Sequence, residues 1–157
     1  MNFWFKTSNK AATGTYHQPL AGYPNGAVFE MSVHNSGYLR AGLFVNGTRY
    51  VDNCTSTKLT DGNWHMCTMT YDGTVIKRYV DAIMEKSTSI SGTLNTSLAL
   101  IMGRHGTNTA YASKETYESD VRVYATALSA DDVKELYHTS ASIDSNGNIH
   151  AREVIEI

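Results

Sequence analysis

The segment from Asp61 to Asp81 constrains the fold of this 157-residue chain most, because it has the pattern of a β-hairpin. From Trp64 to Tyr71 the side chains alternate with a period of two, which suits a strand with one buried face. Asp72-Gly73 follows, and this dipeptide favours a tight turn because both residues tolerate positive φ. The sequence therefore predicts that Val75 to Asp81 returns as the antiparallel partner strand.

The rest of the chain has the composition of short strands joined by tight turns. It holds 12 glycines, 10 tyrosines and only 2 prolines, and it is also rich in Ser and Thr. Turn-forming dipeptides recur at Asn25-Gly26, Asn46-Gly47, Asp61-Gly62, Asp72-Gly73 and Asn146-Gly147. The length suits one domain with a sizeable core. We therefore predict an all-β fold in which helix is the minority element.

Three further strands are predicted to form a meander before the central hairpin. Ala27 to His34 alternates polar and apolar side chains, as a half-buried strand does. Tyr38 to Val45 and Thr48 to Val51 follow it across two tight turns. Arg40 and Arg49 fall on these strands, where we interpret them as solvated, outward-facing residues whose stems cover apolar surface.

Two blocks of the sequence resemble laminin G-like, concanavalin A-like jelly-roll domains. The strings DGNWH, TYDG and YVD are similar to the central hairpin of that family. Asp120 to Tyr137, which contains VRVY and ALS, is similar to the closing strand and the short helix after it. The resemblance implies an all-β, two-sheet antiparallel jelly-roll sandwich with one short C-terminal helix. Because such folds host enzymes, lectins and structural modules alike, function must be argued from a site.

Both ends of the chain depart from the pattern of the resembling family. Phe3 to Phe5 opens abruptly within a strand, whereas the family usually has a longer lead. We expect a truncated form, a fragment of a larger protein, or a variant that completes its sheet differently, and a bare strand edge would be an association site. Ser142 to Asp144 and Ile149 to Ile157 predict a β-hairpin. We therefore divide the chain into a jelly-roll domain, 1–139, and a hairpin tail, 140–157, which resembles tails of phage and prophage proteins.

Ser129 is predicted to cap a helix that runs from Ala130 to about His138. Its hydroxyl can accept from the amide of Asp132 while the Asp132 side chain reaches back, as in a capping box. Val133 and Leu136 lie at helical spacing, so the helix should lay an apolar face on the sandwich.

The two cysteines are predicted to be free thiols, with a disulfide as the alternative. Two cysteines do not make a disulfide framework, and Cys67 stands where the resembling family places a small apolar core residue. This cysteine content fits a reducing assembly compartment. Between the hairpin and the helix we predict loop over Ile83 to Leu94, with a short strand as the alternative, and a compact strand over Leu98 to Gly103. The predicted core consists of Trp64, Cys67, Met69, Val80, Val121, Val123, Leu128, Val133 and Leu136.

Charge and hydropathy argue against several kinds of partner. The formal net charge is −2 and no basic run with interleaved aromatics occurs, so we expect no nucleic acid partner. The longest apolar run is Leu98 to Met102, and the first ten residues lack a signal-peptide pattern, so we expect no membrane span and no secretion by the common route. We expect a location on a virion or an extracellular surface after assembly in the bacterial cytoplasm.

Catalysis is not expected. Jelly-roll glucanases need two carboxylates at a fixed spacing on one strand, and no such run occurs. Gly-x-Ser-x-Gly is absent, and the six histidines are scattered without zinc-ligand spacing. His65 belongs to the hairpin signature of the resembling family, and we interpret it as structural, with its nitrogens bonded to nearby backbone.

The candidate binding residues are aromatic, cationic and amide side chains in loops at the ends of the strands. Such groups stack on sugar rings and bond their hydroxyls, and rigid sandwiches tend to carry binding groups there. They are Tyr23, Asn25, Tyr38, Arg104, His105, Asn108 and Tyr111. Several relatives hold calcium at the sandwich edge, but no Asp-rich calcium loop is present here, so we predict no cofactor and keep calcium as the alternative.

Two functions follow as hypotheses. The first is a non-catalytic, lectin-like module that binds a glycan or cell-surface polysaccharide on a phage particle or bacterial surface protein. The second is a structural or assembly domain of a phage virion that contacts other virion proteins, or a second copy of itself, and has no glycan ligand.

Overall fold

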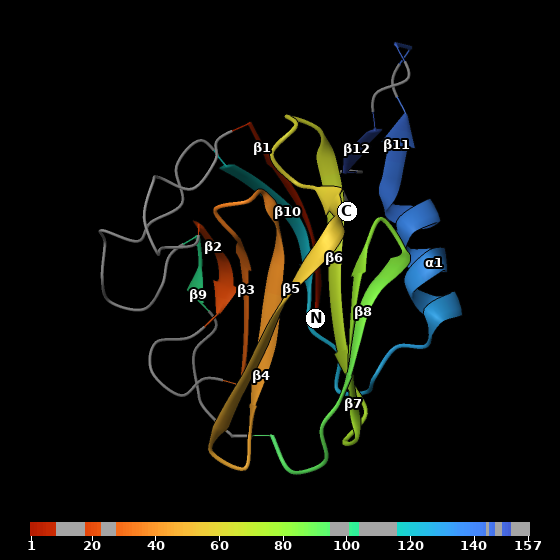
Figure 1. Cartoon of the computed structure of the whole chain (residues 1–157). Helices are drawn as coiled ribbons and strands as arrows, with labels where there is room; N and C mark the ends of the chain where they lie inside the picture. The colour runs from red at the N-terminus through yellow and green to blue at the C-terminus, as the bar shows by residue number, and fades with distance from the viewer. Residues whose placement is uncertain are drawn as a thin grey trace.

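The computed structural model of the chain describes residues 1–8, 18–22, 28–94, 101–103, 116–143, 145–146 and 149–151. Two five-stranded antiparallel sheets pack face to face, with one helix outside them (Figure 1). The first sheet has the order β10-β1-β6-β7-β8 and the second β5-β4-β3-β2-β9. The predicted all-β sandwich with one short C-terminal helix is thereby confirmed.

The first sheet contains β1 (Asn2–Thr7), β6 (Trp64–Tyr71), β7 (Val75–Val80), β8 (Ile83–Ser89) and β10 (Thr116–Arg122). The second contains β2 (Gln18–Gly22), β3 (Phe29–Val33), β4 (Tyr38–Val45), β5 (Thr48–Lys58) and β9 (Ile101–Met102). Helix α1 (Ala130–Ser140) is followed by a small hairpin, β11 (Ala141–Ile143) and β12 (Ile149–Ala151). No helix in these described ranges is long and apolar enough to cross a membrane.

The central hairpin forms where the sequence predicts it, between β6 and β7. At its turn the Asp72 carboxylate accepts hydrogen bonds from the backbone of Thr74 and Val75, both at 2.8 Å, while Gly73 takes a φ of 96°. The prediction of one buried face is wrong, because six of the eight residues of β6 are buried. One face lies between the sheets and the other lies under α1, so β6 belongs to the middle layer of three.

Strand β1 is an interior strand of the first sheet, paired with β6 on one side and β10 on the other. Phe3 and Phe5 point into the core between the sheets. Trp4 points the opposite way into a second apolar cluster, in which Val133 of α1 is completely buried. The bare edge that the sequence raised is therefore not at β1; among the described strands the sheet edges are β10, β8, β5 and β9.

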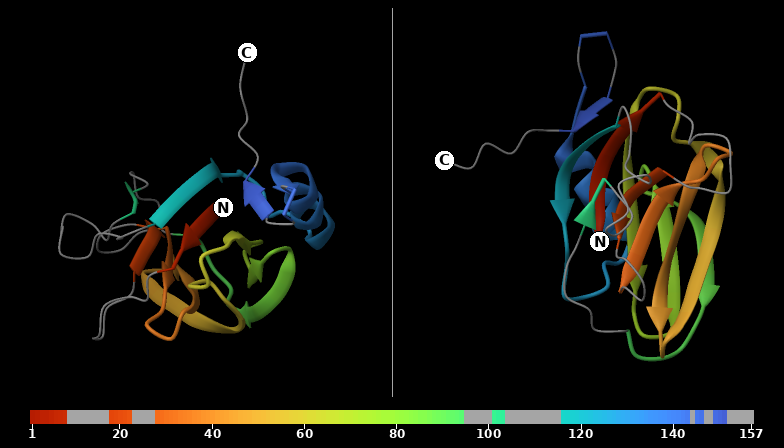
Figure 2. Two further views of the ribbon diagram at one scale, coloured as in Figure 1. Left: turned by 90° about the horizontal axis from the view of Figure 1, so that it is seen from above. Right: turned by 90° about the vertical axis from the view of Figure 1, so that its left-hand side faces the viewer.

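Helix α1 and the hairpin after it cover the outer face of the first sheet (Figure 2). The predicted capping box at Ser129 and Asp132 is present. The ring of Tyr137 stacks on that of Trp4 with 5.5 Å between centroids. The indole Nε1 of Trp4 donates a 2.8 Å hydrogen bond to Oγ of Ser140, the last residue of the helix. These contacts join the first strand to the final helix.

Most of the predicted core is correct, and its errors lie at β10 and at Trp64. Cys67, Met69, Val80 and Val133 are buried, and Leu128 and Leu136 are partly buried against the second cluster. Trp64 is only partly buried there, and Trp4 takes the buried position instead. Val121 and Val123 are 40% and 61% exposed. A shift of register where β10 meets β1, next to Asp120 with its φ of 49°, breaks the alternation that predicted both valines as buried.

The segment after the central hairpin, predicted as loop with a short strand as the alternative, contains the seven-residue strand β8, the edge of the first sheet. It follows β7 through a turn at Asp81 and Ala82, whose φ angles are 51° and 64°. Neither residue is Gly, so the sequence gives little sign of this turn. Strand β5 also runs past its predicted end at Val51 to Lys58. Of the strand predicted over Leu98 to Gly103, residues 101–103 are described, and they contain β9.

Cys54 and Cys67 are free thiols buried in the core between the sheets, as predicted. Burial raises the pKa of the Cys54 thiol to about 12 and that of Cys67 well above its usual value. Both therefore act as small apolar side chains.

Glu118 of β10 carries a carboxyl group that is poorly suited to ionisation. It is the cross-strand partner of Phe5, so its side chain lies on the core side of the sheet. Its Oε1 is buried without a hydrogen-bond partner. Burial raises the pKa of Glu118 from 4.5 to about 7.

The two tryptophans should differ in their contribution to stability. Trp4→Ala should lower the free energy of unfolding by about 3–5 kcal/mol, because it removes a fully buried ring from a packed cluster. Trp64→Ala is the matched control and should cost clearly less, because the ring is partly exposed. Urea denaturation of both variants tests this, and equal losses would contradict the assignment of Trp4 to the core.

The Glu118 carboxyl should make stability fall as the pH rises. A raised folded-state pKa means that its favourable contribution is complete below the unfolded value of 4.5 and is lost as the pH passes about 7. Glu118→Gln cannot ionise, so it should match the wild type at low pH and melt at a higher temperature above neutrality. Parallel pH profiles of the two proteins would count against the buried carboxyl.

Candidate functional site

Tyr38 is the one predicted binding residue that falls within the described residues. It is the first residue of β4 and is partly exposed. The ammonium of Lys58 lies over its ring at 4.3 Å from the centroid, so a cation already occupies one ring face. The other six predicted residues lie outside the described residues: Tyr23, Asn25, Arg104, His105, Asn108 and Tyr111. The predicted rim site therefore stays a prediction.

A second set of polar side chains lies on the outer face of the second sheet, on the three adjacent strands β3, β4 and β5. Pairing fixes its members, because directly opposed residues of antiparallel strands point to the same face. We call this surface the Glu30 face, and it consists of Glu30, Ser32, Arg40, Gly42, Phe44, Arg49, Val51 and Asn53. Helix α1 covers the other sheet, and no described element lies over this face (Figures 1 and 2).

The centre of the Glu30 face is one carboxylate shared by two guanidinium groups. Arg49 donates to Glu30 through Nε at 2.9 Å and through Nη2 at 2.5 Å. Arg40 donates from Nη1 to Oε1 of the same carboxylate at 2.8 Å. The Glu30 and Arg40 side chains are 11% and 17% exposed, whereas that of Arg49 is 44% exposed. The Arg49 side chain is therefore partly open to solvent, while two hydrogen bonds to Glu30 fix its position.

Arg49 reaches Glu30 across β4, the strand that lies between them. Gly42 is opposite Glu30 on one side and Val51 on the other, and Arg49 is opposite Phe44. Arg49 must therefore extend from β5 across β4 to reach β3. A Cβ atom at Gly42 would lie 2.0 Å from the Tyr50 carbonyl oxygen and 2.6 Å from Cγ2 of Val51, so this position admits only Gly.

The electrostatics of the cluster leave one positive charge without a partner. Burial lowers the pKa of Arg40, the charge of Glu30 opposes that effect, and the charge of Arg49 adds to it. Arginine nevertheless stays protonated in proteins. One carboxylate thus faces two cations, and the net charge of the three side chains is about +1.

Sequence analysis found the strands of this cluster but not the cluster. Arg40 and Arg49 face outward, as interpreted from the sequence. Arg40 is not well solvated, however, because its side chain is only 17% exposed, and both arginines form ion pairs with Glu30. Register was the missing information. The Asn46-Gly47 turn fixes Arg49 opposite Phe44, and applying that register to the meander would have placed both arginines near Glu30.

An apolar pocket opens at one end of the sandwich, where the central hairpin turns. Its volume is about 170 Å³, and its lining includes Phe29, Leu43, Met69, Tyr71 and Tyr124. The hydroxyl of Tyr71 already donates to backbone carbonyls, among them Gly92 at 2.8 Å. The lining also includes Thr70 and Thr126, so the pocket combines apolar side chains with a few polar groups.

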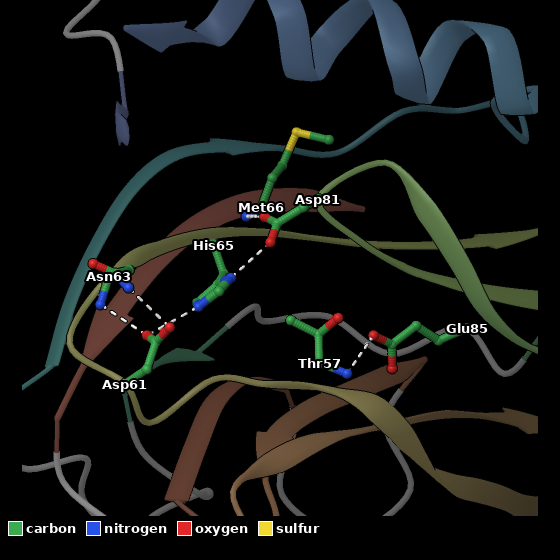
Figure 3. Close-up of polar contacts among 7 residues, drawn as sticks. All are labelled: Thr57, Asp61, Asn63, His65, Met66, Asp81 and Glu85. Atoms are coloured by element: carbon green, nitrogen blue, oxygen red, sulfur yellow. Dashed lines mark hydrogen bonds and ion pairs between the residues drawn. The ribbon is translucent and has the colours of Figure 1, made fainter. Parts of the chain in front are cut away.

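His65 has a structural role, as predicted, but its partners are carboxylates rather than backbone (Figure 3). Nδ1 lies 2.7 Å from Asp81 and Nε2 lies 3.1 Å from Asp61. Burial of the ring lowers the pKa of His65, but its hydrogen bonds to the two aspartates and their charges outweigh burial and raise it. Because Asp81 also accepts from the Met66 amide at 2.8 Å, the group ties the start of β6 to the end of the hairpin.

No group of three or more His, Cys, Asp or Glu side chains in the described part of the chain is placed to hold a metal ion. The absence of a cofactor stays a prediction, and calcium stays the alternative to it.

Comparison with solved structures shows the same sandwich in several binding domains. The binding domain of Paraclostridial Mosquitocidal Protein 1 matches with a TM-score of 0.71 and 15% identity, over 91% of this chain and 38% of that one. The receptor binding domain of botulinum neurotoxin mosaic serotype C/D matches with a TM-score of 0.67 and 16% identity, over 94% and 38%. This chain thus spans about two fifths of those toxin domains.

A smaller protein matches over most of its length. The CBM40 of the Ruminococcus gnavus IT-sialidase, solved with bound α2,3-sialyllactose, has a TM-score of 0.64 and 16% identity, over 87% of this chain and 80% of that one. At such identities these likenesses concern the fold alone. The comparisons give no support to the expected phage origin.

Sequence comparison gives the family directly. No curated protein matches the chain. The profile Laminin_G_3, described as the concanavalin A-like lectin/glucanases superfamily, matches residues 1–134. That match covers both strand blocks that carry the resemblance and most of α1. The chain therefore belongs to the concanavalin A-like lectin/glucanase superfamily.

Proposed function

We propose that this protein is a non-catalytic carbohydrate-binding module whose ligand lies on the Glu30 face. The observation that carries the proposal is the set of groups fixed on three adjacent strands. Phe44 offers a partly exposed aromatic ring opposite Arg49, and the opposed pair Arg40 and Asn53 adds planar hydrogen-bonding groups further along the same face. Protein sites for sugars combine such rings with a few fixed polar groups.

The face is well prepared for binding, because its groups stand on strands rather than on loops. Glu30 holds both arginines through three hydrogen bonds, so little side-chain freedom remains to be lost on binding. Such a face is shallow, and we expect weak affinity, because hydroxyl contacts must offset the water removed from both partners.

The chemistry of this face supports binding rather than hydrolysis. Glycoside hydrolysis by the usual mechanism needs two carboxyl groups across the scissile bond. On β3, β4 and β5 the outward-facing residues include one carboxylate, Glu30, and two guanidinium groups hold it as an anion. The similar structures include a toxin receptor binding domain and a CBM40 bound to α2,3-sialyllactose. A place on a virion or an extracellular surface is a further proposal.

A glycan array with the purified chain should show binding, and Phe44→Ala should weaken it about five- to tenfold, the worth of one aromatic contact. Tyr117→Ala is the matched control, because Tyr117 is a 64% exposed aromatic on the other sheet and should be dispensable. Titration calorimetry on the best array ligand gives the affinities. Repeating it with EDTA tests for calcium.

Other results would identify a different site or a different function. If Tyr111→Ala or Arg104→Ala abolishes binding and Phe44→Ala does not, the predicted rim loops hold the ligand. If the array shows no ligand, the assembly-domain alternative is favoured.

A further inference from the structure

We infer that the ligand of the Glu30 face is an acidic glycan whose carboxylate is bound by Arg40 and Arg49. The inference rests on the proposed function and adds the chemical class of the sugar. It follows from the geometry of the two guanidinium groups and from the charge they leave uncompensated.

The two arginines lie side by side, because both contact the same oxygen of Glu30. Nη1 of Arg40 is 2.8 Å and Nη2 of Arg49 is 2.5 Å from Oε1. Glu30 is the most buried of the three side chains, at 11% exposed against 17% for Arg40 and 44% for Arg49, so we take the side of the pair that faces solvent as its outer edge. A second carboxylate placed on the outer edge would contact both cations from the opposite side.

Donors remain for that second carboxylate. A guanidinium has five N–H groups, and Glu30 uses Nε and Nη2 of Arg49 and Nη1 of Arg40. Among the described residues, none is seen to accept from Nη1 of Arg49 or from Nε and Nη2 of Arg40. The Arg49 side chain is 44% exposed, so solvent reaches part of it.

Charge favours an acidic over a neutral sugar at this place. The cluster carries an excess of one positive charge, and the mutual repulsion of the arginines contributes to the lowered pKa of Arg40. A bound carboxylate would neutralise that excess and form charge-assisted, paired hydrogen bonds, which are the stronger kind. A neutral hydroxyl would displace water from the cations with less compensation. Phe44, opposite Arg49 on the same face, is placed to contact the sugar ring.

The test compares three ligands built on one scaffold: sialyllactose, which carries a carboxylate, sulfated lactose, and lactose itself. Titration calorimetry with the full chain should give an affinity for sialyllactose at least tenfold above that for lactose, as charged hydrogen bonds of this kind imply. The preference should shrink at high salt, because the cluster is partly exposed. Tighter binding of sulfated lactose than of sialyllactose would overturn the carboxylate assignment.

Variants then locate the site. Arg49→Gln and Arg40→Gln should each abolish the preference for sialyllactose. Lys86→Gln, which removes the same charge from an exposed position on β8 of the other sheet, should keep it. Arg49→Lys keeps the charge but loses the planar fork, so it should bind sialyllactose several-fold more weakly with an unchanged melting temperature. Full preference in Arg49→Gln or Arg40→Gln would overturn the assignment to these arginines.

Failure of this inference and failure of the proposed function can be told apart. Equal affinity for lactose and sialyllactose, or binding of neutral array glycans only, overturns the acidic ligand and leaves carbohydrate binding standing. The absence of any glycan ligand overturns both.

Discussion

Strand β1 must bury both of its faces, and the three-layer arrangement follows from that requirement. Its side chains alternate between Phe3 and Phe5, which fill the space between the sheets, and Trp4, which points outward. An indole left in water on the outer face would forfeit most of its burial energy. Helix α1 covers it with Val133, and the Trp4 indole finds its hydrogen-bond acceptor in Ser140. A contact between residues 136 positions apart thus sets where the helix lies.

The covered first sheet leaves the second sheet as the one with an open outer face among the described elements. That face is unusual for a solvent-facing surface, because Glu30 and Ser32 are 8% and 6% exposed although they point outward. The charge of Glu30 is stabilised by hydrogen bonds from both Arg40 and Arg49. A buried charge without partners would be costly, so the three side chains hold one another in one geometry.

The sequence was most informative where structure depends on local pattern. The alternation of β6, the Asp72-Gly73 turn, the meander and the Ser129 capping box all depend on neighbours within a few residues. The errors concern features set by distant partners. Alternation shows that Trp4 and Trp64 lie on strands, but only packing against α1 decides which is buried. Likewise, the register shift in β10 depends on its pairing with β1, and it turned Val121 and Val123 outward. Glu30 and its arginines meet across three strands, so no local pattern identifies the cluster.

The ion pair between Arg49 and Glu30 contributes little to the stability of the fold. An ion pair with one partner as exposed as Arg49 contributes about 0–1 kcal/mol to the free energy of unfolding. Stability therefore does not account for an arginine carried across a neighbouring strand to a carboxylate that Arg40 already contacts. What the arrangement does provide is a guanidinium fixed in position, with unused donors, on an open sheet face. Those are the properties that recognition of an anionic sugar needs.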